Sequence, residues 1–185
     1  MHTPPREGVI SLESSVASDK ARWALFLGVA ALAFLMDQAS KYLVLRNLSL
    51  GEAWNPIPFL TPFVTLTHVT NTGAAFGLFR DQGTLFAIVA IVVVVGIVVF
   101  YRYLPPNQLW LRVSLGLQLG GALGNLLDRV RFGSVVDFID FKIWPVFNLA
   151  DTAIVLGVAI LAFYLLFSKQ EDGERVEGHD GLAQG

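Results

Sequence analysis

The stretch TLFAIVAIVVVVGIVVFY, residues 84–101, determines the class of fold because it contains no charged residue. A helix of about 20 mostly apolar residues crosses a hydrocarbon core of about 30 Å. Three further segments have similar length and apolar content, at 23–45, 109–127 and 148–168. Each must be helical, because an isolated strand in lipid would leave its backbone amides and carbonyls unpaired. The sequence therefore predicts an all-α integral membrane protein with four transmembrane helices.

The composition of the whole chain agrees with membrane insertion. Its 185 residues are 54% hydrophobic and 15% charged, whereas soluble domains carry about 25% charged residues. We expect one membrane domain over residues 22–168, with a retained signal anchor as its first helix and disordered cytoplasmic tails at 1–21 and 169–185. The chain contains no cysteine, which excludes disulfides, a thiol nucleophile and a thiolate zinc site.

The orientation is predicted from the lysines and arginines, which divide almost evenly between the two sides of the expected helices. Such residues favour the cytoplasmic side. Lys41 and Arg129 belong to polar motifs that we expect to be buried, and leaving them out shifts the balance toward cytoplasmic termini. This orientation places Asp137 and Asp151 at the outer face.

The connection over residues 48–83 is too long for a simple turn. Within it, residues 63–70 (FVTLTHVT) are rich in β-branched and aromatic residues, which predicts a strand. We therefore expect a small β element on the outer membrane surface.

Two of the expected helices contain residues whose spacing is informative. Asp37 and Lys41 lie four apart, which favours an intrahelical ion pair over a catalytic role. The segment 109–127 repeats Gly116, Gly120 and Gly124 at four-residue spacing, a pattern that lets helix backbones approach closely in a membrane.

A polar cluster follows these glycines, formed by Asn125, Asp128 and Arg129. Asp128 falls near a helix C-terminus, where the macrodipole disfavours an anion, so a cation must compensate it. Arg129 and Lys41 are the available cations. A structural salt-bridge network and a substrate-binding site explain this cluster equally well.

Two further carboxylates flank a short loop. Asn148 and Asp151 have the spacing of a helix N-cap and a first-turn acid. Only residues 138–147 separate Asp137 from Asn148, so the loop can bring Asp137 and Asp151 close together. Two close carboxylates cannot easily both ionise, so one holds a proton while the other can take one from water. This is the outline of an aspartic protease site. Asp140 could replace Asp137 in it, and spacing alone does not separate them.

Other chemistries lack their residues. His68 is the one histidine outside the tails, too few for a histidine-rich metal site or a Ser/His/Asp triad. Ser40 and Lys41 are neighbours and point about 100° apart on a helix, which suits a Ser/Lys dyad poorly. A small proton- or ion-coupled transporter is the alternative function, because intramembrane carboxylates also mark ion pathways. However, no charged residue lies in 84–101 to continue such a pathway. A purely structural assembly protein would leave the two-aspartate loop unexplained.

Five motifs occur in a fixed order along residues 23–168. They are Asp37-Gln38-Ala39-Ser40-Lys41, Asn71-Thr72-Gly73-Ala74-Ala75-Phe76, the run from Gly120 to Arg129 (GGALGNLLDR), Val136-Asp137-Phe138 and Phe147-Asn148-Leu149-Ala150-Asp151. With these motifs the chain closely resembles the lipoprotein signal peptidases, the bacterial type II signal peptidases.

The resemblance implies a function in the bacterial cytoplasmic (inner) membrane. It implies an aspartyl endopeptidase that removes signal peptides from diacylglyceryl-modified prolipoproteins, before the lipidated lipobox cysteine. No metal, organic cofactor or nucleic acid is implied, and the expected partners are the prolipoprotein substrates and membrane lipids. We expect a monomer.

The resemblance also assigns residues and a fold. The implied catalytic residues are Asp137 and Asp151, which favours Asp137 over Asp140. The implied substrate-binding residues are Asn71, Gly73, Asn125 and Arg129, and the implied supporting residues are Asp37, Lys41, Asp128 and Asn148. The implied fold has four transmembrane helices, an extracytoplasmic β-cradle and a short interfacial helix, which we expect within residues 131–144.

Overall fold

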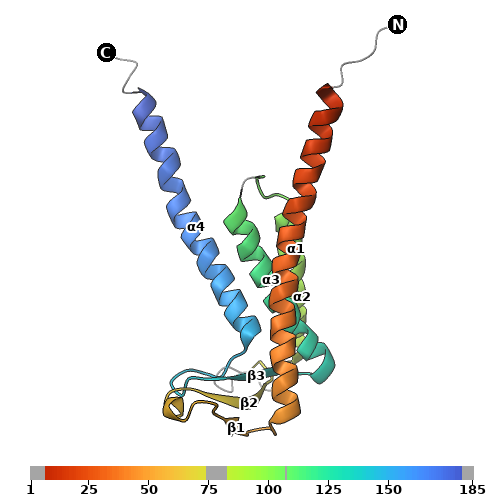
Figure 1. Ribbon diagram of the computed structural model, residues 1–185, viewed down its shortest axis with the longest axis vertical. Helices are drawn as coiled ribbons and strands as arrows, with labels where there is room; N and C mark the ends of the chain where they lie inside the picture. The colour runs from red at the N-terminus through yellow and green to blue at the C-terminus, as the bar shows by residue number, and fades with distance from the viewer. Residues whose placement is uncertain (1–6, 74–82, 107, 181–185) are drawn as a thin grey trace.

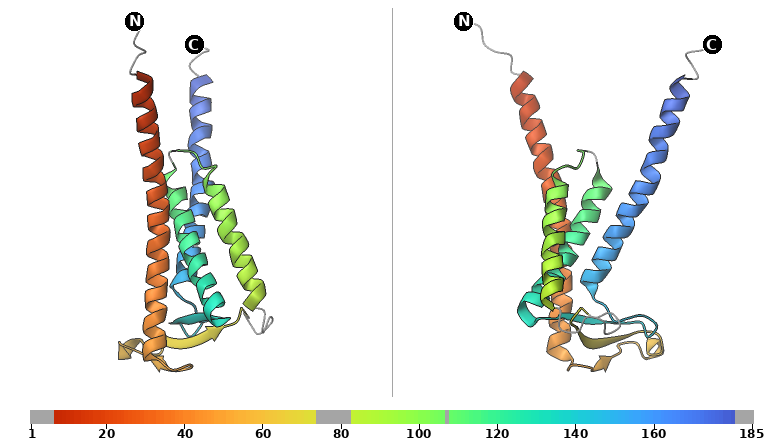
Figure 2. Two further views of the ribbon diagram at one scale, coloured as in Figure 1. Left: turned by 90° about the vertical axis from the view of Figure 1, so that its right-hand side faces the viewer. Right: turned by 180° about the vertical axis from the view of Figure 1, so that it is seen from behind.

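The computed structural model describes residues 7–73, 83–106 and 108–180, which form four long helices and a three-stranded sheet (Figure 1). The helices are α1 (Glu7–Asn47), α2 (Gly83–Tyr101), α3 (Leu109–Phe132) and α4 (Leu149–Asp180). The strands are β1 (Ala53–Trp54), β2 (Thr65–Asn71) and β3 (Val135–Asp140), and a short 3₁₀ helix, η1 (Pro58–Leu60), lies between β1 and β2. The start of α1 and the end of α4 lie at one end of the molecule, and the sheet lies at the other (Figures 1 and 2).

Three of these helices are long and apolar enough to cross a membrane, at Asp19–Asn47, Gly83–Tyr101 and Leu149–Phe167. Helix α3 packs against all three of them. It carries the polar residues Asn125, Asp128 and Arg129, which lower its hydropathy, and its neighbours shield the first two from the surroundings. The chain is therefore a multi-pass membrane protein built around a central polar helix.

The glycines of α3 let the other helices approach its backbone, as their spacing predicted. A Cβ atom at Gly120 would collide with the carbonyl oxygen of Ala30 in α1, and one at Gly121 would collide with that of Ala150 in α4. Gly124 faces the carboxylate of Asp37 in the same way. These contacts bring α1 and α4 together on α3 at the end where the polar residues lie.

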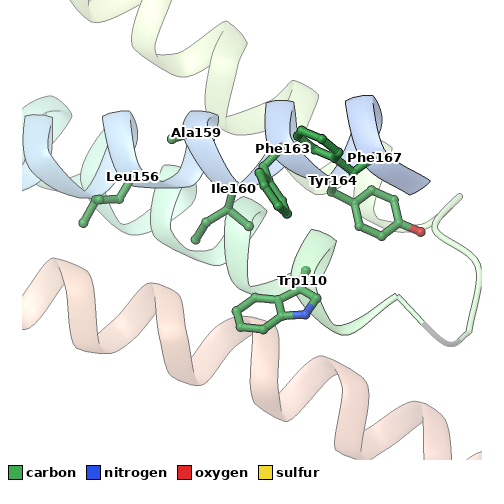
Figure 3. A pocket seen from close by; sticks show the side chains of 7 residues that line it. All are labelled: Trp110, Leu156, Ala159, Ile160, Phe163, Tyr164 and Phe167. Carbon is green, nitrogen blue, oxygen red and sulfur yellow. The ribbon is translucent and has the colours of Figure 1, made fainter. Parts of the chain in front are cut away.

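Helices α1 and α4 diverge away from the sheet (Figures 1 and 2). Here Trp110 of α3 and the apolar face of α4, including Ile160 and Phe163, line a cavity of about 670 Å³ (Figure 3). The described side chains that line it carry no charge, and most of them are apolar. Helix α1 begins within the segment 1–21, and helix α4 ends within the segment 169–185. The disorder expected in these two segments stays a prediction.

The sheet is antiparallel with the order β1-β2-β3. Strand β2 confirms the strand expected at residues 63–70, displaced by one or two residues. Asn71 pairs with Val135 at one end of the β2–β3 ladder, and Thr65 pairs with Asp140 at the other. A register shift between Leu66 and Val69 interrupts the ladder, as a β-bulge does.

The prediction of a short interfacial helix within residues 131–144 is wrong. Helix α3 continues to Phe132, and Gly133 ends it with a φ of 73°, a left-handed conformation that glycine adopts without strain. The following VVDFID segment forms β3, because its β-branched and aromatic residues suit a strand and β2 offers an edge to pair with. Among the described residues, the one short helix is η1.

Candidate active site

Polar side chains from five elements meet where the helices join the sheet. Asp137 lies in β3, and Asn71 ends β2. Asn125 lies in α3, and Asp151 lies in the first turn of α4. Lys41 of α1 completes the group by its contact with Asn125. The structure thus gathers residues that lie up to 110 positions apart in the sequence.

Asp137 is almost fully buried, with 1% of its surface exposed. Its two carboxylate oxygens accept hydrogen bonds from the amides of Asn148 (2.6 Å) and Asn71 (2.9 Å). Burial raises the pKa of Asp137 to about 7. The charge of Asp151 adds to this rise, whereas the two amides and the Lys41 charge oppose it. Near neutral pH this carboxyl therefore exists partly in its protonated form.

Asp151 is less buried than Asp137 and is held by backbone and side-chain amides. The side chain of Asn125 donates to its Oδ1 at 2.8 Å, and the backbone N–H of Asn148 donates to its Oδ2 at 3.3 Å. In return, the Asn148 side-chain oxygen accepts from the Asp151 N–H at 2.9 Å. This reciprocal pair is a capping box, which confirms the N-cap predicted at Asn148.

Asn148 connects the two aspartates through one buried side chain. Its amide nitrogen donates to Asp137, while its amide oxygen accepts from the backbone of Asp151. The strand β3 and the helix start are further joined by hydrogen bonds between Ile139 and Phe147 (2.8 and 3.1 Å). The loop at 138–147 therefore brings Asp137 and Asp151 together, as its length predicted.

Asp140 lies in a different environment from Asp137. Its carboxylate binds the ammonium of Lys142 at 2.6 Å and the hydroxyl of Thr67 at 3.1 Å. Burial opposes its ionisation, but the hydrogen bonds and charge of Lys142 outweigh burial and hold the pKa of Asp140 below its usual range. The geometry thus separates the two acids that sequence spacing left equivalent, since only Asp137 shares contacts with Asp151.

A buried ionic network between α1, α3 and the start of α4 supports this site. Lys41 contacts the carboxylates of Asp37 and Asp128, each at 2.8 Å, and donates to the Asn125 side-chain oxygen at 3.0 Å. Asp37 accepts the N–H of Ala150 at 2.9 Å, which fixes the first turn of α4 to α1. The predicted Asp37–Lys41 ion pair is therefore confirmed, and Lys41 is the cation that compensates Asp128.

Gln38 also belongs to this network, although the sequence analysis assigned it no role. Its side-chain nitrogen lies 3.1 Å from carboxylate oxygens of both Asp37 and Asp128. It also lies 3.2 Å from the Gly124 carbonyl oxygen. The available signal was a further polar side chain between Asp37 and Lys41 in a membrane-spanning helix.

Arg129 lies beside a cavity of about 390 Å³ that Thr72, Gly83 and Thr84 also line. Its guanidinium donates to the Asn125 carbonyl at 3.3 Å and stacks over the Phe86 ring at 5.7 Å. Within the described parts of the chain, its buried Nε has no hydrogen-bond partner. We call this cavity the polar recess, and Arg129 connects it to Asp151 through Asn125.

Gly73 forms the end of the segment that leads from β2 toward this recess. Its N–H donates to the Asn71 side-chain oxygen at 2.9 Å, which orients the Asn71 amide nitrogen toward Asp137. Gly73 has a φ of 99°, and a Cβ there would collide with the Phe86 ring. The rest of its motif, Ala74 to Phe76, lies outside the described residues.

The arrangement can perform acid–base chemistry with two carboxyls of different character. Among residues that the structure describes, no group of three or more His, Asp or Glu side chains is placed to hold a metal ion. A buried carboxyl that keeps a proton beside a more exposed carboxylate is the arrangement that hydrolysis of a carbonyl compound requires.

Comparison with known proteins identifies the family. Residues 29–167 match the family model described as signal peptidase (SPase) II. The chain belongs to this family. It is therefore a peptidase of bacterial membranes, and the transporter and assembly alternatives are set aside.

Individual relatives support this membership. The lipoprotein signal peptidase of Moorella thermoacetica is 51% identical over 80% of this chain and 97% of its own length. That of Pelotomaculum thermopropionicum is 46% identical over 80% of this chain and 95% of its own length. A solved bacterial membrane enzyme superposes with a TM-score of 0.71 at 33% identity, covering 79% of this chain and 90% of the other.

Proposed function

We propose that this signal peptidase uses Asp137 and Asp151 as a catalytic pair to remove signal peptides from diacylglyceryl-modified prolipoproteins, cleaving before the lipidated lipobox cysteine. The observation that carries the proposal is the pair itself. Asn148 holds both residues, and burial raises the pKa of Asp137 to about 7 while Asp151 stays more exposed.

The two carboxyls then take different roles. Asp151 is the base that removes a proton from a water molecule, whose oxygen attacks the scissile carbonyl carbon. Asp137 is the acid that donates its proton to the carbonyl oxygen, so that a neutral tetrahedral diol forms. The diol collapses when its C–N bond breaks, the leaving nitrogen receives the proton held by Asp151, and one diol hydroxyl returns its proton to Asp137. Both residues end in their starting protonation states.

The polar recess around Arg129 is the proposed binding site for the substrate near the scissile bond. Arg129 lines this cavity of about 390 Å³, and its buried Nε has no hydrogen-bond partner among the described residues. Thr72 lines this recess between Asn71 and Gly73, so an extended peptide in the recess would pass beside both residues. Asn125 joins the recess to Asp151 through its own hydrogen bonds.

The membrane topology is also a proposal. We place α3 as a fourth transmembrane helix, since its 24 residues are long enough and α1, α2 and α4 surround it. Four spans put both termini on one side, and the charge distribution favours the cytoplasm. The aspartates then face the periplasm or cell exterior, at the depth where a lipidated cysteine keeps its acyl chains in the bilayer. We expect the monomer to be active, because Asn71, Asn125 and Asn148 of the same chain already hold both aspartates.

The test is cleavage of a diacylglyceryl-modified lipobox peptide by the purified protein in detergent. We expect Asp137→Asn and Asp151→Asn each to lower the rate by at least about 10³-fold, the scale of general acid–base catalysis. Asp140→Asn is the matched control, because Asp140 lies three residues from Asp137 in the same strand but contacts Lys142. Substantial turnover by either of the first two variants, or an equal loss in the control, would contradict the assignment.

A further inference from the structure

One end of the sheet carries an unusual concentration of exposed apolar side chains. The loops at 55–64 and 141–146 flank the paired residues Thr65 and Asp140, so both loops leave the sheet at the same end. We call these two loops the apolar tip. Ile143 is 93% exposed, Phe59 81% and Trp144 69%. Soluble surfaces rarely gather large apolar side chains in this way, and such patches mark interaction sites.

The tip presents almost no charge. Lys142 is its one charged residue. The ammonium of Lys142 binds Asp140 at 2.6 Å and the Thr65 hydroxyl at 2.7 Å, so its charge is neutralised on the sheet. The same contacts tie the loop at 141–146 to both β2 and β3. The apolar side chains are therefore displayed from a rigid support.

The position of the tip indicates what covers it. Helices α2 and α4 begin near the sheet, at Gly83 and Leu149, and the last turns of α1 before Asn47 run beside it (Figure 1). The sheet therefore lies where the bilayer meets water. In Figure 1 and in the right view of Figure 2, the tip end of the sheet projects sideways past the start of α4. A surface beside a transmembrane helix at this level meets lipid, and aromatic residues are favoured there.

We propose that the apolar tip inserts into the interfacial layer of the lipid leaflet next to α4. Insertion holds one end of β3 at a fixed depth, and Asp137 lies about 10 Å further along the same strand. The tip thereby sets the height of the catalytic carboxyl relative to the lipid surface. This inference depends on the membrane embedding of the helices and does not depend on the catalytic roles of the aspartates.

The test measures the depth of single positions in the full-length protein. Because the chain contains no cysteine, Ile143→Cys and Leu50→Cys each provide a unique site for an environment-sensitive NBD fluorophore. Leu50 is a matched control, since it is also apolar and 65% exposed. It belongs to the segment between the end of α1 and β1, at the edge of the sheet that lies farthest from α2, α3 and α4 (Figure 1). The labelled proteins are placed in phosphatidylcholine–phosphatidylglycerol nanodiscs.

At position 143 we expect a blue-shifted emission, quenching by lipids that carry a nitroxide on the acyl chain, and a loss of quenching by aqueous iodide. At position 50 we expect strong iodide quenching and little lipid quenching. A Phe59→Cys label on the other loop should repeat the result at 143. Equal iodide quenching at 143 and 50 would overturn the proposal. Shielding at 143 that arises only after addition of the lipidated peptide would also overturn it, and would assign the tip to substrate contact.

Discussion

Replacing Asp137 with asparagine should make the protein increasingly more stable than the wild type as the pH rises. Burial raises the pKa of Asp137 to about 7 in the folded protein, whereas a carboxyl in an unfolded chain has a pKa of about 3.9. Between these two values the unfolded chain releases the proton and the folded protein retains it. The wild type therefore loses stability with rising pH, by about 4 kcal/mol in total, because one pKa unit corresponds to about 1.4 kcal/mol. Asparagine does not titrate and avoids this loss.

The pH dependence of the difference is the quantity to measure, because the substitution also has a constant cost. Both carboxylate oxygens of Asp137 accept amide N–H groups, from Asn71 and Asn148. An asparagine at this position would turn its own N–H₂ toward one of these donors. That repulsion lowers stability by the same amount at every pH, so it shifts the whole plot of the difference in unfolding free energy against pH without changing its slope.

The assay is thermal unfolding of the purified proteins in detergent, followed by tryptophan fluorescence from about pH 4 to about pH 8. Asp140→Asn should behave in the opposite way. The pKa of Asp140 is held below its usual range, so its ionised form stabilises the fold at neutral pH and this stabilisation is lost as the pH falls. A constant difference for Asp137→Asn, or one that grows toward low pH, would refute the buried, proton-retaining site.

Three further outcomes follow from the same contacts. The kcat/KM for a lipidated peptide should fall as the pH rises above about 7, because Asp137 must carry a proton; a rate unchanged up to about pH 9 would contradict this role. Lys41→Met should lower the unfolding free energy by about 3–5 kcal/mol in chemical denaturation, because it leaves two buried carboxylates without their cation. Gly120→Leu should cost more than about 3 kcal/mol because its side chain meets the α1 backbone, whereas Gly28→Leu, which meets open space, should cost little.

The four helices and strand β2 could be predicted because local patterns determine them. Residues 84–101 have no alternative to a membrane helix, and 63–70 have the composition of a strand. The prediction of an interfacial helix at 131–144 was wrong because this segment pairs with a strand that is distant in the sequence. The segment VVDFID forms β3 because β2 supplies an edge 64 to 75 residues earlier in the chain. Local propensity gives no information about that partner.

Part of the candidate site could also be predicted from the sequence. The capping box at Asn148 and the Asp37–Lys41 pair depend on spacing within one helix, and both are present. The choice between Asp137 and Asp140 depends on which face of β3 meets α4. That face is fixed by the pairing of β3 with β2 and with Phe147. Spacing along the strand could not give it.

The buried charges of α1 explain why an amide holds Asp151. An ammonium only donates hydrogen bonds and a carboxylate only accepts them. Asn125 lies between Lys41 and Asp151, so its oxygen must face Lys41 and its nitrogen must face Asp151, as observed. An aspartate at 125 could not donate to Asp151, and a lysine could not accept from Lys41. The cation in α1 therefore fixes the orientation of an amide in α3, and that amide fixes a carboxylate in α4. This coupling gives the buried ion pair a role in positioning the proposed catalytic pair.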